Sequence, residues 1–184
     1  MQLAGGFADP PVDAARAFRA AMSAMARPGQ IERVAGVGPP APVSPAAGTL
    51  LLTLVDAETP LHLAGEADCG AVRDWLAFHT GAPIVGPERA AFALGTWEAL
   101  GPLDAYPVGL PDYPDRSATL IVELDRLEAE GATLTGPGIE HAAALNLPER
   151  ADFQANAALF PLGLDFYFTC GDRLAALPRT TRVG

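Results

Sequence analysis

The chain has 184 residues, of which 49% are hydrophobic and 18% are charged, and its formal net charge is −10. This length and composition predict one globular domain over residues 1–184 and exclude a disordered chain. All 12 basic residues are arginines, and an acidic chain without a basic stripe repels a phosphate backbone, so we expect no nucleic-acid binding. No apolar run approaches the length of a membrane span and no export signal is visible, so we predict a cytoplasmic protein that does not enter the membrane.

The N-terminal part of the sequence predicts two helices joined by a loop. Asp9 and Pro10 are typical of a helix start, and the apolar side chains that follow recur at helical spacing until Arg27-Pro28-Gly29 ends the pattern. That apolar face consists of Val12, Ala15, Phe18, Met22 and Met25, with Arg16 and Arg19 on the other side. Residues 35–45 are rich in proline and form a loop, and Ser44-Pro45 predicts a second helix over residues 46–55.

The middle of the chain alternates between short strands and a helix. Residues 61–64 predict a strand, and Asp68 is expected to cap a third helix. One face of that helix carries Val72, Trp75, Leu76 and His79. Residues 91–95 predict a buried strand, and residues 102–114, with four prolines, predict an irregular loop.

A central hairpin is predicted next. Residues 118–124 alternate as a strand does when one face is buried, and the acidic residues 125–131 are typical of a solvated turn. Residues 132–135 are then the second strand of the hairpin, which Gly136-Pro137-Gly138 ends at a sharp bend.

The C-terminal part completes an α/β pattern. We expect a short strand over residues 142–147, a helix over 148–159 and a strand over 164–170. Gly171-Asp172 is a good two-residue turn, so residues 173–177 should return as a hairpin partner. Interleaved helices and strands predict a layered α/β/α domain with a mixed β-sheet.

Two residues are candidates for a chemical role, and each has a more common structural explanation. His79 lies beside Trp75 on an apolar face, where a buried neutral imidazole is the more frequent outcome. Cys170 ends a strand on its apolar face, and no nearby base marks it as a nucleophile. For these reasons we predict no catalytic residue. The histidines and cysteines also lack the close pairs of a zinc site, so we predict no metal.

The absence of lysine excludes two kinds of cofactor site. A phosphate-binding loop of the GxxxxGK[ST] type requires a lysine, and so does the internal Schiff base of pyridoxal phosphate. The bend at residues 136–138 is no dinucleotide fingerprint either. We therefore expect no cofactor.

The C-terminal sequence P-R-T-T-R, residues 178–182, has two interpretations. Its two arginines and two threonines could hold a phosphate or phosphonate through charge-assisted hydrogen bonds. More often, such arginines rest against an acidic surface or a partner. The same two interpretations apply to Arg27 in Arg27-Pro28-Gly29, and His79 is also a possible ligand contact. The ligand-contact candidates are therefore Arg27, His79, Arg179, Thr180 and Arg182.

Taken together, six short segments resemble the PhnH family, a subunit of the bacterial carbon–phosphorus lyase system. They are FRAAMSAMARPG (18–29), WLAFHTGA (75–82), SATL (117–120), TGPGI (135–139), FPLGLD (160–165) and LPRTT (177–181). They occur in the expected order over almost the whole chain, which makes the combination specific.

The resemblance implies a fold like that of pyridoxal-phosphate-dependent transferases with the cofactor lost. It also implies assembly with PhnG, PhnI and PhnJ in a core complex that, with an ATPase-like subunit, displaces adenine from ATP by a phosphonate. The product would be a ribose 1-phosphonate 5-triphosphate, such as α-D-ribose 1-methylphosphonate 5-triphosphate from methylphosphonate, whose C–P bond another subunit later breaks. The resemblance supplies no catalytic residues.

We therefore expect a non-autonomous subunit of a transferase or lyase complex, with a structural or assembly role and a homodimeric state when isolated. Two alternatives stay open. One is an independent small-molecule enzyme that uses His79 or Cys170 with the C-terminal arginines, and the other is a module that binds phosphonate or nucleotide without transforming it.

Overall fold

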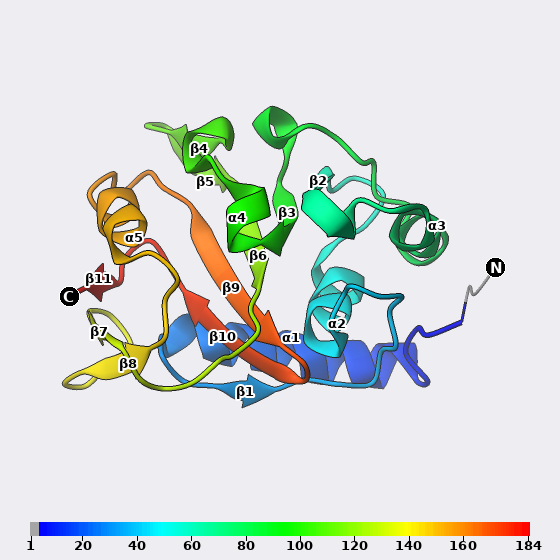
Figure 1. Ribbon diagram of the computed structural model, residues 1–184, viewed down its shortest axis with the longest axis horizontal. Coiled ribbons are helices and arrows are strands. Elements are labelled where there is room, and N and C mark those ends of the chain that lie inside the picture. The colour runs from blue at the N-terminus through cyan, green and yellow to red at the C-terminus, as the bar shows by residue number, and fades with distance from the viewer. Residues whose placement is uncertain (1–3) are drawn as a thin grey trace.

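A six-stranded mixed sheet forms the centre of the computed structural model, which describes residues 4–184 (Figure 1). Its strand order is β1-β10-β9-β6-β3-β2. The strands are β1 (Glu32–Arg33), β10 (Arg173–Leu177), β9 (Asp165–Cys170), β6 (Thr119–Glu123), β3 (Phe92–Thr96) and β2 (Leu61–Leu63). Strands β2, β3, β6 and β9 are parallel, whereas β10 and β1 are antiparallel to their neighbours. The prediction of a mixed sheet in an α/β protein is confirmed.

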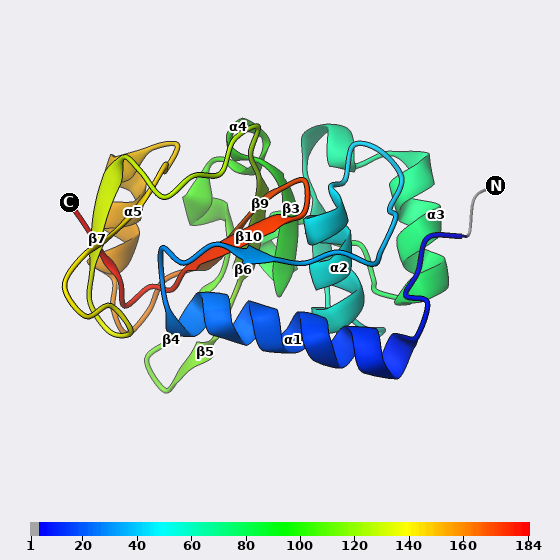
Figure 2. The same cartoon turned by 90° about the horizontal axis from the view of Figure 1, so that it is seen from below.

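Three helices pack against one face of this sheet. They are α1 (Pro10–Ala26), α2 (Pro45–Leu54) and α3 (Gly70–His79). Leucines of α2 and Trp75 of α3 share one core cluster with Leu94 and Ile121 of the sheet. Viewed from below, α1 runs along the sheet beside β1 and β10 (Figure 2). Ser44 caps α2 as predicted, since its Oγ accepts a hydrogen bond from the Ala47 N–H at 3.2 Å.

The other face is covered by two helices and a small second sheet. The helices are α4 (Trp97–Leu100) and α5 (Arg150–Ala157). The second sheet has the order β11-β7-β8, with β11 (Arg182–Val183), β7 (Ala132–Thr135) and β8 (Ala143–Leu145). Phe153 of α5 packs edge-on against Phe166 and Phe168 of β9, with ring centroids 5.0 and 5.7 Å apart. The large sheet therefore lies between two separate apolar cores.

The predicted central hairpin is wrong. Strand β6 pairs with β3 and β9, and β7 belongs to the second sheet, where it pairs with β8 and β11. The sequence pattern misleads because β6 is buried on both faces: Leu120 and Val122 lie in one core and Ile121 lies in the other. Two-sided burial is typical of a central parallel strand, which cannot be half of a tight hairpin.

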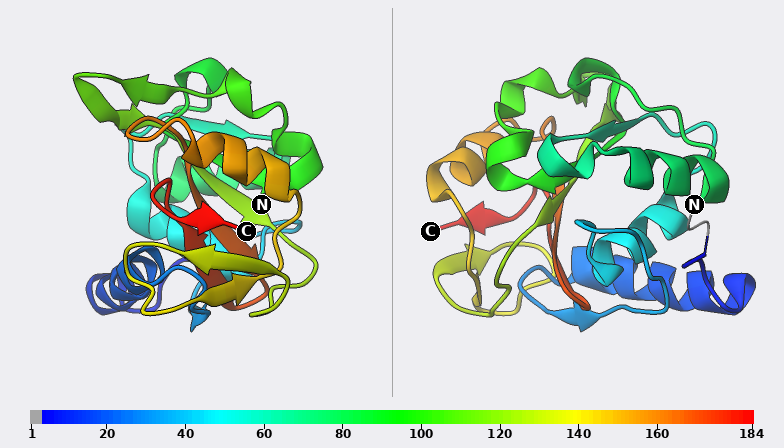
Figure 3. Two further views of the ribbon diagram at one scale, coloured as in Figure 1. Left: turned by 90° about the vertical axis from the view of Figure 1, so that its left-hand side faces the viewer. Right: turned by 45° about the vertical axis from the view of Figure 1, so that its right-hand side comes forward.

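The proline-rich segment 102–114 contains more structure than the predicted irregular loop. After the short 3₁₀ turn Leu103–Ala105, β4 (Val108–Leu110) and β5 (Tyr113–Ser117) pair as a two-stranded antiparallel hairpin. This hairpin projects from the body of the molecule (Figure 3). Two further 3₁₀ turns, Gly65–Ala67 and Pro87–Arg89, complete the structure.

The structure also corrects two details of the helices. In α1 the buried residues are Ala17, Ala21 and Ala24, not the predicted apolar face. In α3 the N-cap residue is Cys69, while Asp68 forms an ion pair with Arg73 at 2.5 Å. Small alanines let α1 approach its neighbours closely. Of the predicted face, Met25 packs partly against the core, whereas Val12, Phe18 and Met22 are exposed.

Candidate functional site at the C-terminal arginines

Three glycine- and proline-containing segments meet near the C-terminus. A Cβ atom on Gly138, whose φ is +83°, would lie 1.9 Å from the Ala26 carbonyl oxygen, just before Arg27-Pro28-Gly29. A Cβ atom on Gly136, whose φ is +132°, would lie 3.1 Å from the Thr180 carbonyl oxygen. Glycine is therefore required at this bend, because only a residue without a side chain adopts these angles and allows such close approach.

A cavity of about 460 Å³ lies beside this bend. Three of the predicted ligand-contact residues, Arg179, Thr180 and Arg182, line it. The other lining residues are Gly136, Pro137, Ala157 and Phe160. Tertiary structure thus brings the C-terminal arginines together with the Gly136-Pro137-Gly138 bend and the end of α5.

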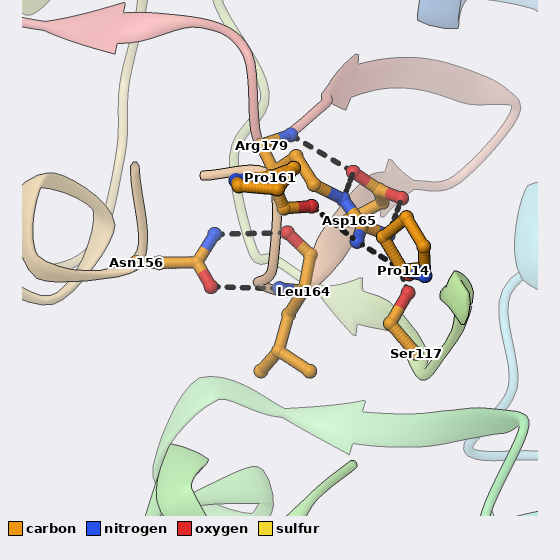
Figure 4. A network of polar contacts seen from close by, with 7 residues as sticks. All are labelled: Pro114, Ser117, Asn156, Pro161, Leu164, Asp165 and Arg179. Carbon is orange, nitrogen blue, oxygen red and sulfur yellow. Dashed lines mark hydrogen bonds and ion pairs between the residues drawn. The ribbon is translucent and has the colours of Figure 1, made fainter. Parts of the chain in front are cut away.

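Arg179 is held inside the protein by a dense network of polar contacts (Figure 4). Its Nε and Nη2 donate to the two carboxylate oxygens of Asp165, at 3.2 and 2.6 Å. Nη1 donates to the Pro114 carbonyl at 2.9 Å and to the Pro161 carbonyl at 3.4 Å, and Nη2 also donates to the Ser117 hydroxyl. Only 12% of the Arg179 side chain is exposed.

These contacts decide what Arg179 can do. A guanidinium has five N–H hydrogens, and the five contacts use all of them. The Arg179 backbone N–H also donates to Asp165, at 2.8 Å. The residue therefore clamps β5 and the turn before β9 to the C-terminal segment, and it leaves no donor for an anion in the cavity. Asp165 in turn ties the start of β9 to the C-terminal segment.

A second pair of hydrogen bonds holds the turn before β9 in place. The Asn156 side chain donates to the Leu164 carbonyl at 2.8 Å and accepts from the Leu164 N–H at 2.7 Å (Figure 4). Asn156 is 8% exposed, and buried backbone groups need hydrogen-bond partners. Its side-chain amide therefore pairs with the Leu164 N–H and C=O as a neighbouring backbone would. The bonds fix the start of β9 and with it the position of Asp165.

The remaining predicted site residues are more scattered. Arg182 is exposed and Thr180 is half-buried at the same cavity. Arg27 is exposed at the end of α1 and does not line the cavity. His79, in α3, lies at the opposite end of the molecule from β11, with its ring centroid 5.1 Å from that of Trp75 and 4.9 Å from that of Phe78 (Figure 1).

Cys170 and the other possible metal ligands also lie apart. The Cys170 thiol donates to the Asp125 carbonyl at 3.3 Å. Within residues 4–184, no group of three or more His, Cys, Asp or Glu side chains could hold a metal ion.

The helices of residues 4–184 were also compared with a membrane span. None combines the length and the apolar character needed to cross a membrane.

Sequence reasoning missed one partly buried acid, Glu123 at the carboxyl end of β6. Burial raises the pKa of its carboxyl group, although hydrogen bonds from the Ser44 N–H at 2.7 Å and the Thr169 hydroxyl at 2.8 Å oppose that shift. Its sequence signal is an ionisable residue directly after the apolar run Leu120-Ile121-Val122. A central parallel strand presents such a residue at the edge of the sheet where ligands commonly bind.

The chain is similar to known proteins over nearly its full length. Residues 5–184 match the family model described as bacterial phosphonate metabolism protein, PhnH. A Rhizobium meliloti (strain 1021) protein, α-D-ribose 1-methylphosphonate 5-triphosphate synthase subunit PhnH, is 37% identical over 97% of this chain and 94% of the relative. A putative C-P lyase subunit protein, HtxG of Stutzerimonas stutzeri, is 30% identical over 91% of this chain and 84% of its own length. The chain belongs to the PhnH family of bacterial phosphonate metabolism proteins.

Proposed function

We propose that this chain is a subunit of the carbon–phosphorus lyase system that has a structural or assembly role in making ribose 1-methylphosphonate 5-triphosphate. Family membership carries the proposal, since the relative with 37% identity is named as a subunit of that synthase. The Arg179 clamp supports a structural role, because all N–H groups of this guanidinium donate hydrogen bonds to acceptors within the protein.

The finer parts of the proposal concern partners, fold and location. We propose that residues 1–184 form a single PhnH-like domain that assembles with PhnG, PhnI and PhnJ in the cytoplasm. We also propose that its α/β fold resembles that of pyridoxal-phosphate-dependent transferases without the cofactor lysine. At the C-terminal cavity, Thr180 and Arg182 are the proposed contacts for a ligand or a partner, because their side chains are accessible there.

An independent enzyme has less support. It would combine His79 or Cys170 with the C-terminal arginines. Helix α3, which carries His79, lies at the opposite end of the molecule from β11 (Figure 1). Cys170 is the last residue of β9, whereas Arg179 binds Asp165, the first residue of that strand. A general base must come within hydrogen-bond reach of the group it acts on, so these residues do not form one active site.

Co-expression tests the proposal directly. An affinity-tagged chain is expressed with untagged PhnG, PhnI and PhnJ, and we expect all three to be retained with it through size-exclusion chromatography. The control replaces the chain by an unrelated tagged protein of similar net charge, because acidic surfaces alone attract basic proteins. Failure of PhnG, PhnI and PhnJ to co-purify would contradict the proposal.

A second experiment separates a subunit from an autonomous enzyme. The purified chain is incubated with ATP and methylphosphonate, and phosphorus NMR follows both substrates. We expect no turnover by the chain alone and turnover when the partner subunits are added. Conversion by the isolated chain would show that the reactive groups lie in this polypeptide.

A further inference from the structure

A second cavity lies at the carboxyl edge of the parallel strands, away from the C-terminal arginines. Its volume is about 540 Å³, which is within the range of small-molecule sites, roughly 300–1,000 Å³. Gly95 and Thr96 at the end of β3, Glu123 at the end of β6 and Gly65 just after β2 all line it. Ligands of open α/β sheets bind at this edge, so the position favours a binding site.

The walls of the cavity are mainly apolar. Val43, from the loop before α2, and Leu94 of β3 are both buried and contribute aliphatic surface. Ala64, Ala67 and further small residues complete the walls. Such walls fit the hydrocarbon part of a ligand, since covering apolar surface releases water.

Every ionisable residue that lines the cavity is a glutamate. Glu66 lies in the 3₁₀ turn after β2 and Glu98 lies in α4, and both are exposed at the mouth. Glu123 lies deeper, where the Ser44 N–H and the Thr169 hydroxyl hold its two oxygens. Among the described residues, no arginine or histidine lines this cavity. Three carboxylates around an apolar space repel phosphates and phosphonates and attract a cation with an apolar stem.

We propose that this cavity binds an alkylammonium or alkylguanidinium group, whose hydrocarbon stem lies against the Val43 and Leu94 wall and whose charge faces Glu66, Glu98 and Glu123. The group could belong to a free amine or to a lysine or arginine side chain of another protein. The two sources share one chemistry, and the experiment below distinguishes them. The proposal is independent of the assignment to a phosphonate-processing complex.

Titration of the full-length ¹⁵N-labelled chain tests this site. The probes are n-butylammonium and n-butylguanidinium, with butan-1-ol and butyrate as neutral and anionic analogues of similar size. We expect the two cations to shift the backbone amide signals of Ala67, Gly95 and Thr96 with a Kd on the order of 1 mM. The alcohol and the carboxylate should leave these signals in place, and equal shifts from either one would overturn the proposal.

Paired variants show whether the carboxylates are responsible. Removing the two glutamates at the mouth, with Glu66→Gln and Glu98→Gln together, should weaken cation binding about tenfold. The matched control is Glu58→Gln with Glu88→Gln, which changes net charge equally at exposed positions shortly before β2 and β3, near the amino ends of those strands. Unchanged binding by the first double variant, or an equal loss in the control, would refute the site.

The source of the cation is tested with a short peptide. A lysine-containing peptide and the same peptide with acetylated lysine are titrated in parallel with butylammonium. Binding of butylammonium alone assigns the site to a free amine, whereas tighter binding of the unmodified peptide assigns it to a protein side chain. If neither binds, the proposal is wrong.

Discussion

Arg179 shows how burial changes the role of a charged side chain. In the sequence it is one of two arginines that could hold an anion, but in the structure all five of its N–H hydrogens have acceptors within the protein. A partly buried ion pair whose remaining donors are all satisfied rigidifies the segments that it joins. The clamp links residues distant in sequence, since Pro114 and Ser117 are 65 and 62 positions from Arg179.

Removing this clamp should destabilise the fold. Arg179→Ala leaves Asp165, which is 23% exposed, without its cationic partner, and we expect a loss of about 3 kcal/mol in the free energy of unfolding. Urea denaturation followed by circular dichroism measures the change. The control is Arg182→Ala at the exposed neighbouring arginine, which should change stability by no more than about 0.5 kcal/mol. Equal effects of the two substitutions would contradict the clamp.

Glu123 predicts a pH dependence of stability. Burial raises its pKa above the ordinary value of 4.5, so the folded protein takes up this proton at a higher pH than the unfolded chain does. The stabilisation is therefore fully present below pH 4.5 and is lost as the pH rises through the pKa of the folded state.

The variant Glu123→Gln isolates this contribution, because the amide cannot titrate and its oxygen can still accept from Ser44. We expect the unfolding free energy of the natural protein minus that of the variant to fall as the pH rises from 4 and then to level off. Urea denaturation at a series of pH values measures this difference. A difference that stays constant, or that grows with pH, would show that Glu123 is not the group responsible.

At the scale of the elements, α1 packs differently from what its sequence pattern predicts. Ala17, Ala21 and Ala24 face the protein, while Val12, Phe18 and Met22 are 42, 49 and 55% exposed. Several large apolar side chains on one exposed helix are typical of an interaction surface. We propose that this surface supports the homodimer expected of the isolated chain.

Charged substitutions on α1 test that proposal. Phe18→Asp with Met22→Asp should raise the dimer dissociation constant at least about tenfold, because each buries a charge at the contact. Sedimentation equilibrium over a range of concentrations measures the shift. The control is Leu159→Asp, at a 48% exposed leucine just after α5. If only Leu159→Asp abolished the dimer, the contact would lie near Leu159 and not on α1. If the natural protein were monomeric at all concentrations, the proposed homodimer would be wrong.

At the scale of the whole molecule, the six-stranded sheet joins two cores. Adjacent residues of β6 point to opposite sides, with Ile121 in one core and Leu120 and Val122 in the other. Both cores pack against the same sheet. Unfolding of one core would disrupt the sheet against which the other packs, so the two should unfold together.

The two tryptophans of the chain can test this cooperativity. Trp75 lies in the core on the helical side, and Trp97 packs against the other core. We expect Trp97→Phe and Trp75→Phe, each with one remaining tryptophan, to show fluorescence transitions in urea that coincide with the loss of circular dichroism in the same variant. Two separated transitions would show that the cores unfold independently and would argue against a single domain.

The sequence by itself determined the features that depend on neighbouring residues. The start of α2 at Ser44-Pro45 and the hairpin of β9 and β10 across Gly171-Asp172 were predicted correctly, because capping and tight turns are local interactions. The absence of lysine is a property of composition alone. Each of the six family segments is a run of consecutive residues, so the sequence was enough to indicate the PhnH family.

Only the tertiary structure decided which segments lie side by side. Residues 118–124 and 132–135 are close in sequence, yet they belong to different sheets, because pairing with β3 and β9 buries β6 on both faces. Likewise, the sequence pattern of α1 identifies its apolar residues but not which of its faces will find a neighbour. The role of Arg179 depends on acceptors in two other segments, β5 and residues 161–165, and long-range contacts of this kind leave no trace in local sequence patterns.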